Sequence, residues 1–187
     1  MKKLSFHPIQ HFLTVTEHRL LVMKLCFKVG LYQQGLLHDL SKYSFAEFWV
    51  GAMYYQGNRS PNNAEREERG YSSAWLHHKG RNKHHYEYWV DYNSRAESAE
   101  EILIPVKMPI KYVVEMLMDR ISASKVYNRG NYSDDLPLKY FAFSMERITM
   151  HEDTKRLLYK LLKMLSVRGE ERTFKFIREK LLKRAAA

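Results

Sequence analysis

Apolar residues recur every three or four positions along almost the whole chain, and residues that interrupt helices are scarce. The sequence holds eight glycines and five prolines among 187 residues, and no segment alternates apolar and polar residues as a half-buried strand does. A spacing of three or four places apolar side chains on one face of a helix. We therefore predict an all-α protein, and its length predicts a single domain, a helical bundle of residues 1–187.

Prolines, glycines and polar segments set the boundaries of the expected helices. Ser44 and Glu47 have the spacing of a capping box, in which both side chains bond backbone N–H groups at the start of a helix. Residues 56–73 are polar, so we expect a mobile surface loop, with room for one helical turn, that partly covers the functional site. The predicted helices are 8–29, 31–40, 44–55, 73–78, 83–95 and 110–127, followed by two or three over about 134–184 with a break near Gly169.

The helix predicted over 110–127 carries apolar residues on more than one side, which is typical of the central helix of a bundle. Asp119 lies on one of its apolar stripes, between Met116 and Ala123. A carboxylate in apolar surroundings is costly unless it is paired, hydrogen-bonded or bound to a metal ion. Asp119 is therefore a candidate functional residue.

Four of the nine histidines fall within the segment WLHHKGRNKHHYEYW, residues 75–89. Helix packing does not require such density, whereas metal ligation and proton transfer both use imidazole groups. The alternative is a basic loop that binds nucleic acid. Protonated imidazoles this close would repel one another, so we expect the rings to be metal-bound or carboxylate-paired and to face one cavity. The two pairs are His77 with His78 and His84 with His85, and the basic residues between them are Lys79, Arg81 and Lys83.

A second candidate group precedes this cluster in the sequence. His38 and Asp39, in LLHDLSKYS, end an apolar helix and can converge on one ion from that end. His18 lies on the apolar face of the first helix, where a histidine is either a core residue or a ligand. His11 lies on the same face, and we assign it to the core.

This order of residues resembles the HD-domain superfamily of metal-dependent phosphohydrolases, which are all-helical proteins. Their motif runs His, His-Asp, further His in two-metal members, and Asp, and the resemblance extends over about residues 10–127. Many members have a lysine three residues after the Asp that contacts a substrate phosphate, and Lys42 occupies that position. The segments HDLSKYS and WLHHKGRNKHHYEYW are also similar to an uncharacterised family of bacterial and phage proteins, some of which have carried a catalase label.

The resemblance implies a metal site built on the helices of about 8–128. It implies that Asp39 bridges a first metal to a second one held by one histidine from each pair. His78 and His84 flank the turn at Gly80 most closely and are the expected ligands, while His77 and His85 would support them as hydrogen-bond donors. Oxygen and imidazole ligands suit one or two divalent ions of Mn, Fe, Co, Ni or Zn. The implied ligands of the first metal are His18, His38, Asp39 and Asp119.

We therefore expect a phosphohydrolase that acts on a nucleotide or another phosphate ester through a metal-activated water. Asp39 and Lys42 would take part in catalysis. Two alternatives remain, namely an HD-type di-iron oxidase or oxygenase with the same ligands, and a basic helical protein that binds nucleic acid. The residues expected to bind phosphate are Lys42, Lys79, Arg81 and Lys83.

The formal net charge of +10 suits an anionic partner such as a phosphorylated small molecule, a nucleotide or nucleic acid. The chain has one cysteine and no apolar segment that resembles a membrane span or a signal peptide, so we expect a cytoplasmic protein. The pattern leaves the oligomeric state open. The closing KRAAA resembles a cloning remnant, so residues 185–187 stay outside the predicted helices.

Overall fold

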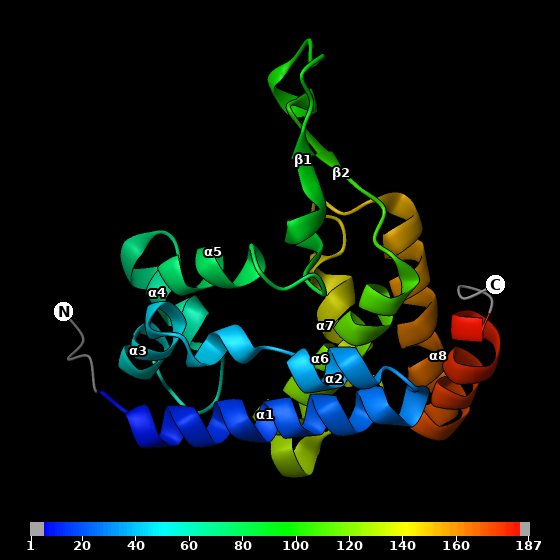
Figure 1. Ribbon diagram of the computed structural model, residues 1–187, viewed down its shortest axis with the longest axis horizontal. Helices are drawn as coiled ribbons and strands as arrows, with labels where there is room; N and C mark the ends of the chain where they lie inside the picture. Colours follow the sequence, from blue (N-terminus) through cyan, green and yellow to red (C-terminus); the bar gives the residue numbers. More distant parts are fainter. Residues whose placement is uncertain (1–5, 184–187) are drawn as a thin grey trace.

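Helix α1 (Pro8–Val29) runs along one side of the molecule and carries two groups of helices (Figure 1). The computed structural model describes residues 6–183. The elements after α1 are α2 (Tyr32–Leu37), η1 (Leu40–Tyr43), α3 (Phe45–Met53), α4 (Pro61–Arg69), α5 (Ser73–Lys79), η2 (Tyr86–Trp89), β1 (Val90–Tyr92), η3 (Ala99–Glu101), β2 (Leu103–Pro105), α6 (Ile110–Asn128), η4 (Arg129–Asn131), α7 (Leu136–Ser144), α8 (Glu152–Phe176) and the π-helical turn η5 (Ile177–Leu182). Helices α3, α4 and α5 gather at the amino-terminal end of α1, and α6, α7 and α8 lie toward its other end.

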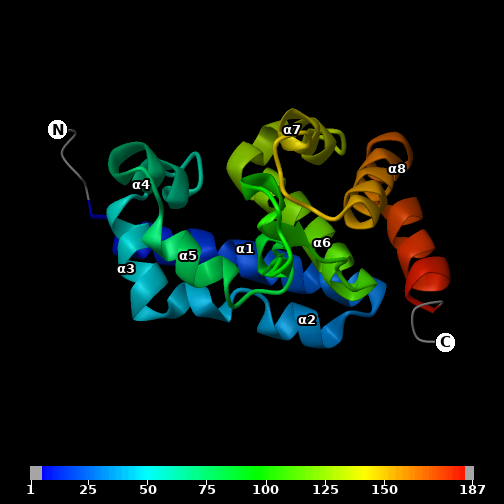
Figure 2. The same cartoon turned by 90° about the horizontal axis from the view of Figure 1, so that it is seen from above.

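The all-α prediction is confirmed, and α6 lies at the centre of the bundle (Figure 2). Nine of the 19 residues of α6 are buried, as expected for a central helix. Burial of each large apolar side chain contributes roughly 1.5–3 kcal/mol relative to an exposed one. Since α6 also carries Glu115 and Asp119, the packing of the core fixes where these carboxylates lie. The core side chains include Val22 and Leu25 of α1, Leu117 and Ile121 of α6, and Leu158 and Leu162 of α8.

Two predicted helix breaks are confirmed, and each lies at a glycine with a positive φ. Gly30 ends α1 at φ 88, a left-handed conformation that glycine adopts without a steric cost. Gly169 has φ 74 and ψ 173 and interrupts α8. The predicted end of the last helix at 184 and the alanines at 185–187 lie outside the described residues. No helix within 6–183 is both long and apolar enough to cross a bilayer.

The helix predicted over 83–95 is wrong, and so is the expectation of no strands. Residues 86–89 form the 3-10 turn η2, after which β1 pairs with β2 in an antiparallel hairpin. The register joins Val90 to Pro105 and Tyr92 to Leu103. Figure 1 shows this hairpin projecting away from the body. A helix needs a core to cover its apolar face, and Tyr92 is 67% exposed, whereas strand pairing satisfies the backbone without one.

The segment 56–73 contains more helix than the single turn expected. Helix α4 begins with Pro61 in its first turn and ends at Gly70, which has φ 80. Proline suits the first turn because its missing N–H has no partner there, and glycine suits the left-handed end. Inside α4, Glu65 accepts hydrogen bonds from the hydroxyls of Ser72 and Ser73, which ties the segment to the start of α5.

Gly51 of α3 packs against the ring of His11 on α1, and we expect Gly51→Ala to destabilise the protein. A Cβ atom at this position would lie 2.3 Å from Nε2 of His11. His11 is buried, and burial, together with Lys42, lowers its pKa to about 4, so its ring is a neutral core group. The overlap should lower the free energy of unfolding by roughly 1–3 kcal/mol, which urea denaturation would measure.

Gly80→Ala is the matched control, because a Cβ atom there would meet backbone oxygens at 3.5 Å and beyond. It should leave stability nearly unchanged. His11→Ala should cost less stability in the Gly51→Ala background than in the wild type, since the clash disappears with the ring. Equal stability of Gly51→Ala and the wild type would show that α1 and α3 are not packed as described.

Candidate metal centre

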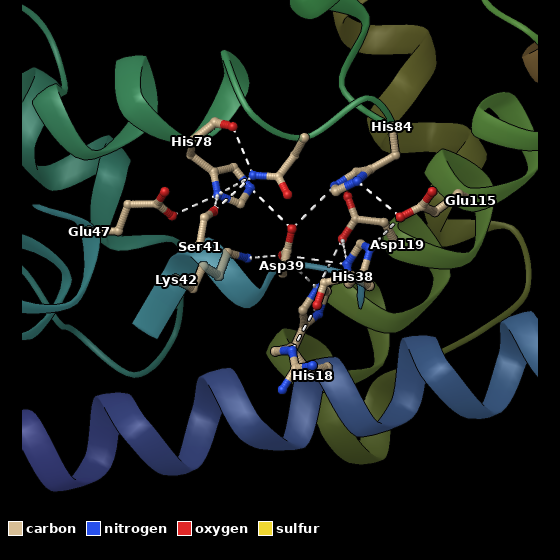
Figure 3. A network of polar contacts seen from close by, with 12 residues as sticks. His18, His38, Asp39, Ser41, Lys42, Glu47, His78, His84, Glu115 and Asp119 are labelled. Atoms are coloured by element: carbon tan, nitrogen blue, oxygen red, sulfur yellow. Dashed lines mark hydrogen bonds and ion pairs between the residues drawn. The ribbon is translucent and has the colours of Figure 1, made fainter. Parts of the chain in front are cut away.

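Asp39 lies at the centre of a buried network of polar side chains (Figure 3). Helix α2 ends at Leu37, earlier than the predicted 40, because the backbone leaves helical geometry at His38, which has ψ 126. Asp39 then adopts a left-handed conformation with φ 53 and ψ 25. Aspartate is one of the few residues that tolerate this region. The resulting corner is held to α1 by Arg19, whose Nε donates to the carbonyl oxygen of His38 over 2.7 Å. This corner lets the adjacent His38 and Asp39 converge.

The first group of candidate ligands joins three separate segments of the chain. Nε2 of His18, on α1, lies 2.9 Å from Oδ1 of Asp119, on α6. Nε2 of His38 lies 3.4 Å from Oδ2 of Asp39 and 3.8 Å from Oδ1 of Asp119. One ligand atom from each of these four residues lies within 4.8 Å of the others, so together they could hold one metal ion. The structure thus brings together all four residues implied for the first metal.

The second group lies on the other side of the Asp39 carboxylate. Oδ1 of Asp39 is 3.2 Å from Nε2 of His78 and 3.3 Å from Nε2 of His84. His85 completes this group, again with one ligand atom from each residue within 4.8 Å of the others. Asp39 is therefore shared, with Oδ2 directed toward the first group and Oδ1 toward the second.

The two histidine pairs face inward, because Asn82 closes the turn between them. Its amide Nδ2 donates to the backbone oxygen of His78 over 2.8 Å and to Oγ of Ser41 over 2.9 Å. His84 is buried as well as His78, and both rings direct Nε2 toward Asp39. The sequence offers a weak signal for the role of Asn82, since asparagine is common in turns.

Five imidazole nitrogens in this network are buried and make no hydrogen bond of normal geometry. Buried polar atoms in proteins nearly always have a partner, so a convergent set without one requires an explanation. Imidazole nitrogens around two carboxylates, without any thiolate, form a donor set that suits a divalent transition metal. The residues fit such an ion. The five atoms are Nε2 of His18, His38, His78, His84 and His85.

Two further carboxylates orient the rings from behind. Oε1 of Glu115 lies 3.0 Å from Nδ1 of His38 and 3.2 Å from Nδ1 of His84. Oε2 of Glu47 lies 2.7 Å from Nδ1 of His78. A carboxylate only accepts, so Nδ1 donates in each pair and Nε2 is the ring atom that faces Asp39. This atom can bind a metal ion once it carries no proton. Carboxylates commonly orient metal-binding histidines in this way.

Sequence reasoning preferred a capping role for Glu47 over a supporting role at the site, and it missed Glu115. The capping box of Ser44 and Glu47 is wrong, because Oγ of Ser44 makes no hydrogen bond and Glu47 turns to α5 instead. Local spacing is compatible with either role, so only the tertiary contact decides. Glu115 had a usable signal: it lies one helical turn before Asp119, on the same side of the central helix.

His77 and His85, both expected to be supporting donors, differ in position. Nδ1 of His77 lies 2.6 Å from Oε1 of Glu47. This ring therefore holds in place the same carboxylate that orients His78. His85 instead places its ring among the candidate ligands, with its centre 4.1 Å from that of His84. The second group therefore contains three imidazoles where the sequence predicted two.

Burial and neighbouring charges act in opposite directions on the pKa values of the site. Burial disfavours the carboxylate form of Asp39, but the charges of His38 and Lys42 outweigh it and hold the pKa of Asp39 well below its usual range. Burial also disfavours a charged His78, yet the Asp39 carboxylate raises its pKa to about 9. Burial and the neighbouring imidazoles lower the pKa of His85 well below its usual range. A metal ion that binds His78 at neutral pH must therefore displace a proton.

A cavity of about 760 Å³ opens beside both groups. Lys42 lines it, with Nζ 2.6 Å from Oδ2 of Asp39. Residues 58–63 form part of its wall, in agreement with the expectation that segment 56–73 partly covers the site. The other three residues predicted to bind phosphate are not brought to this cavity, because they extend from the turn that Asn82 closes. They are Lys79, Arg81 and Lys83.

The fold and the site define an all-α protein with two candidate metal-ligand groups that share one aspartate. The chain belongs to a family of unknown function, DUF5662, whose model matches residues 7–164. Neither a curated protein nor a solved structure matches the chain. The matched range includes every candidate ligand from His18 to Asp119, so the site lies within the region that defines the family.

Proposed function

We propose that the protein is a metal-dependent phosphohydrolase of the HD type whose two divalent ions are held by the two groups that share Asp39. The observation that carries this proposal is the convergence of five buried Nε2 atoms, none of which makes a hydrogen bond of normal geometry, near the carboxylates of Asp39 and Asp119. Nδ1 of three of these rings is already bonded to Glu47 or Glu115. The expected ions are Mn, Fe, Co, Ni or Zn, which all accept imidazole and carboxylate ligands.

Bound divalent ions supply an activated water near neutral pH and positive charge that binds phosphate oxygens. The protein contributes charge and shape around them. Lys42 places its ammonium group between Asp39 and the cavity, where it can stabilise negative charge that develops on a phosphoryl group. The cavity also has aromatic wall residues, among them Trp75, Tyr86 and Tyr127, that suit a planar group of a substrate.

A di-iron oxidase or oxygenase is the second candidate, because the same ligands could hold iron. The second group offers three imidazoles and one carboxylate, and imidazole suits iron as well as the hydrolytic metals. The nucleic-acid alternative rests on the net charge of +10 and on the basic residues Lys79, Arg81 and Lys83, which lie outside the cavity. His78 and His84 are buried, so they would take no part in such a surface.

Metal analysis combined with a phosphate-release assay tests the proposal. Protein expressed with ample metal should contain at least one transition-metal ion per chain and should release phosphate from nucleotides or aryl phosphates. Release should stop with a chelator and return with Mn, Co, Ni or Zn. Iron with a visible absorption band, oxygen consumption and no phosphate release would establish the redox alternative, and protein without bound metal would exclude both.

A further inference from the structure

Arg120 follows the candidate ligand Asp119 on α6 and lines the same cavity. Its guanidinium group makes no hydrogen bond and no ion pair to any residue that the structure describes, and its Nε atom is fully buried. The guanidinium carbon lies 5.2 Å from the centre of the Phe141 ring, which is an apolar neighbour. A guanidinium carries five N–H donors and a permanent charge. The charges of Asp119 and Glu87 favour the guanidinium cation, but no hydrogen bond joins it to either carboxylate. Enclosing its donors without a hydrogen-bond acceptor is unfavourable, so its position favours an anion from outside the chain.

The other basic residues on the cavity wall differ from Arg120, because each has a polar partner. Nζ of Lys42 pairs with Asp39 over 2.6 Å. Arg59 forms a two-pronged pair with Glu67 at 2.5 and 2.6 Å. Arg66 donates to Oδ1 of Asn63 over 3.1 Å. The donors of Arg120 are therefore available to a ligand in a way that these three are not.

We propose that Arg120 binds an anionic, oxygen-bearing group of the substrate other than the phosphoryl group attacked at the metal centre. A carboxylate or a second phosphate fits, because a guanidinium holds two oxygens of either in parallel hydrogen bonds. A cavity of about 760 Å³ has room for a substrate much larger than inorganic phosphate. That the bound anion belongs to a substrate rests on the proposed function, whereas anion binding by Arg120 does not.

Glu87 places a negative charge in the same cavity and provides a second test of anion binding. Its Oε2 atom is buried without a hydrogen bond, and no ion pair joins it to Arg120. A bare anion bound by Arg120 would be repelled by this carboxylate. The two residues should therefore affect anion binding with opposite signs: Arg120→Gln weakens the binding of inorganic phosphate, and Glu87→Gln strengthens it.

Calorimetric titration with inorganic phosphate, together with thermal unfolding, tests this assignment in the metal-loaded protein and again after treatment with a chelator, which removes phosphate binding at the metal centre. Arg120→Gln should bind phosphate about ten-fold more weakly than the wild type, as expected for the loss of a charged hydrogen-bond pair. Arg120→Lys keeps the charge but loses the planar guanidinium group. Its affinity for phosphate should lie between those of the wild type and Arg120→Gln. Arg172→Gln, on the exposed surface of α8, is the matched control and should bind as the wild type does. Without phosphate, Arg120→Gln should unfold at the same temperature as the wild type or higher, since a cation without an acceptor has been removed.

Equal phosphate affinities in the wild type and Arg120→Gln would overturn the proposal, as would a wild type that does not bind phosphate. A fall of several degrees in Tm without phosphate, repeated in Glu87→Gln, would show that the two residues pair in solution and are structural. If hydrolysis is found, phenyl phosphate and 4-carboxyphenyl phosphate separate binding at the metal centre from binding of a second anionic group by Arg120. Arg120→Gln should raise KM for the second compound only, with kcat nearly unchanged for both. A protein with no metal and no hydrolysis that still loses phosphate affinity in Arg120→Gln would reject the proposed function alone.

Discussion

Asp39→Asn should remove the metal ions from both ligand groups. Asp39 is the one carboxylate that the two groups share, and its two oxygens face different histidines. Asparagine tolerates the left-handed backbone at this position, so the corner after α2 should survive while the charge and one ligand oxygen are lost. We expect a loss of metal affinity of at least about 100-fold, which is the upper end of what even an indirect supporting contact contributes. Metal content of the purified protein and competition with a chelator measure it.

Asp91→Asn is the matched control, because this aspartate is exposed on the hairpin and should not affect metal content. His38→Ala should weaken metal binding in the first group as Asp39→Asn does. It should have a smaller effect on metal binding in the second group. Wild-type metal content in Asp39→Asn would show that the ligand assignment is wrong. A partial loss, with a single ion retained, would show that the groups do not depend on a common bridge.

Glu115→Gln should weaken the binding of both ions although Glu115 is not expected to contact either. Its carboxylate accepts from Nδ1 of His38 in the first group and from Nδ1 of His84 in the second. A neutral amide orients the rings less firmly and makes them poorer ligands, at a cost of roughly 10–100-fold in metal affinity. Chelator competition at fixed pH would resolve the two binding steps.

Glu47→Gln separates this effect from a general disturbance of the site. Glu47 contacts His77 and His78, so its substitution should weaken the second ion and leave the first nearly unchanged. Glu146→Gln, at an exposed position, should change neither. Wild-type affinity for both ions in Glu115→Gln would show that Glu115 does not support the ligands. An equal loss of affinity for the first ion in Glu47→Gln and in Glu115→Gln would show a general disturbance of the site.

The candidate ligands were predictable because their chemistry is local and their order resembles a known motif. The identity of His18, His38, Asp39 and Asp119 came from this order, and the density of the histidine segment marked His78 and His84 without any knowledge of the fold. The structure brings the other five together around the carboxylate of Asp39. Their orientation was not predictable, because it depends on the corner at Asp39 and on the turn that Asn82 closes.

The errors share one physical origin, which is the influence of a distant partner on a local pattern. Residues 90–92 read as helix in isolation, but they form a strand because residues 103–105 pair with them. Glu47 has the spacing of a cap, but α5 places two imidazoles within reach of it. In both cases the local preference is worth about 1 kcal/mol or less per residue, which a single tertiary contact can outweigh.

The sequence by itself determined the helical class, the central position of α6, the helix breaks at Gly30 and Gly169, and the residue types available to a site. These follow from backbone sterics and from side-chain periodicity, which act over a few neighbouring residues. Only the tertiary structure decided which groups meet. His38 and Glu115 lie 77 residues apart in the chain and 3.0 Å apart in space. Arg120 reaches the cavity and Lys83 does not. Packing decides the position of Arg120, because the buried side chains of α6 fix how this helix is oriented in the core.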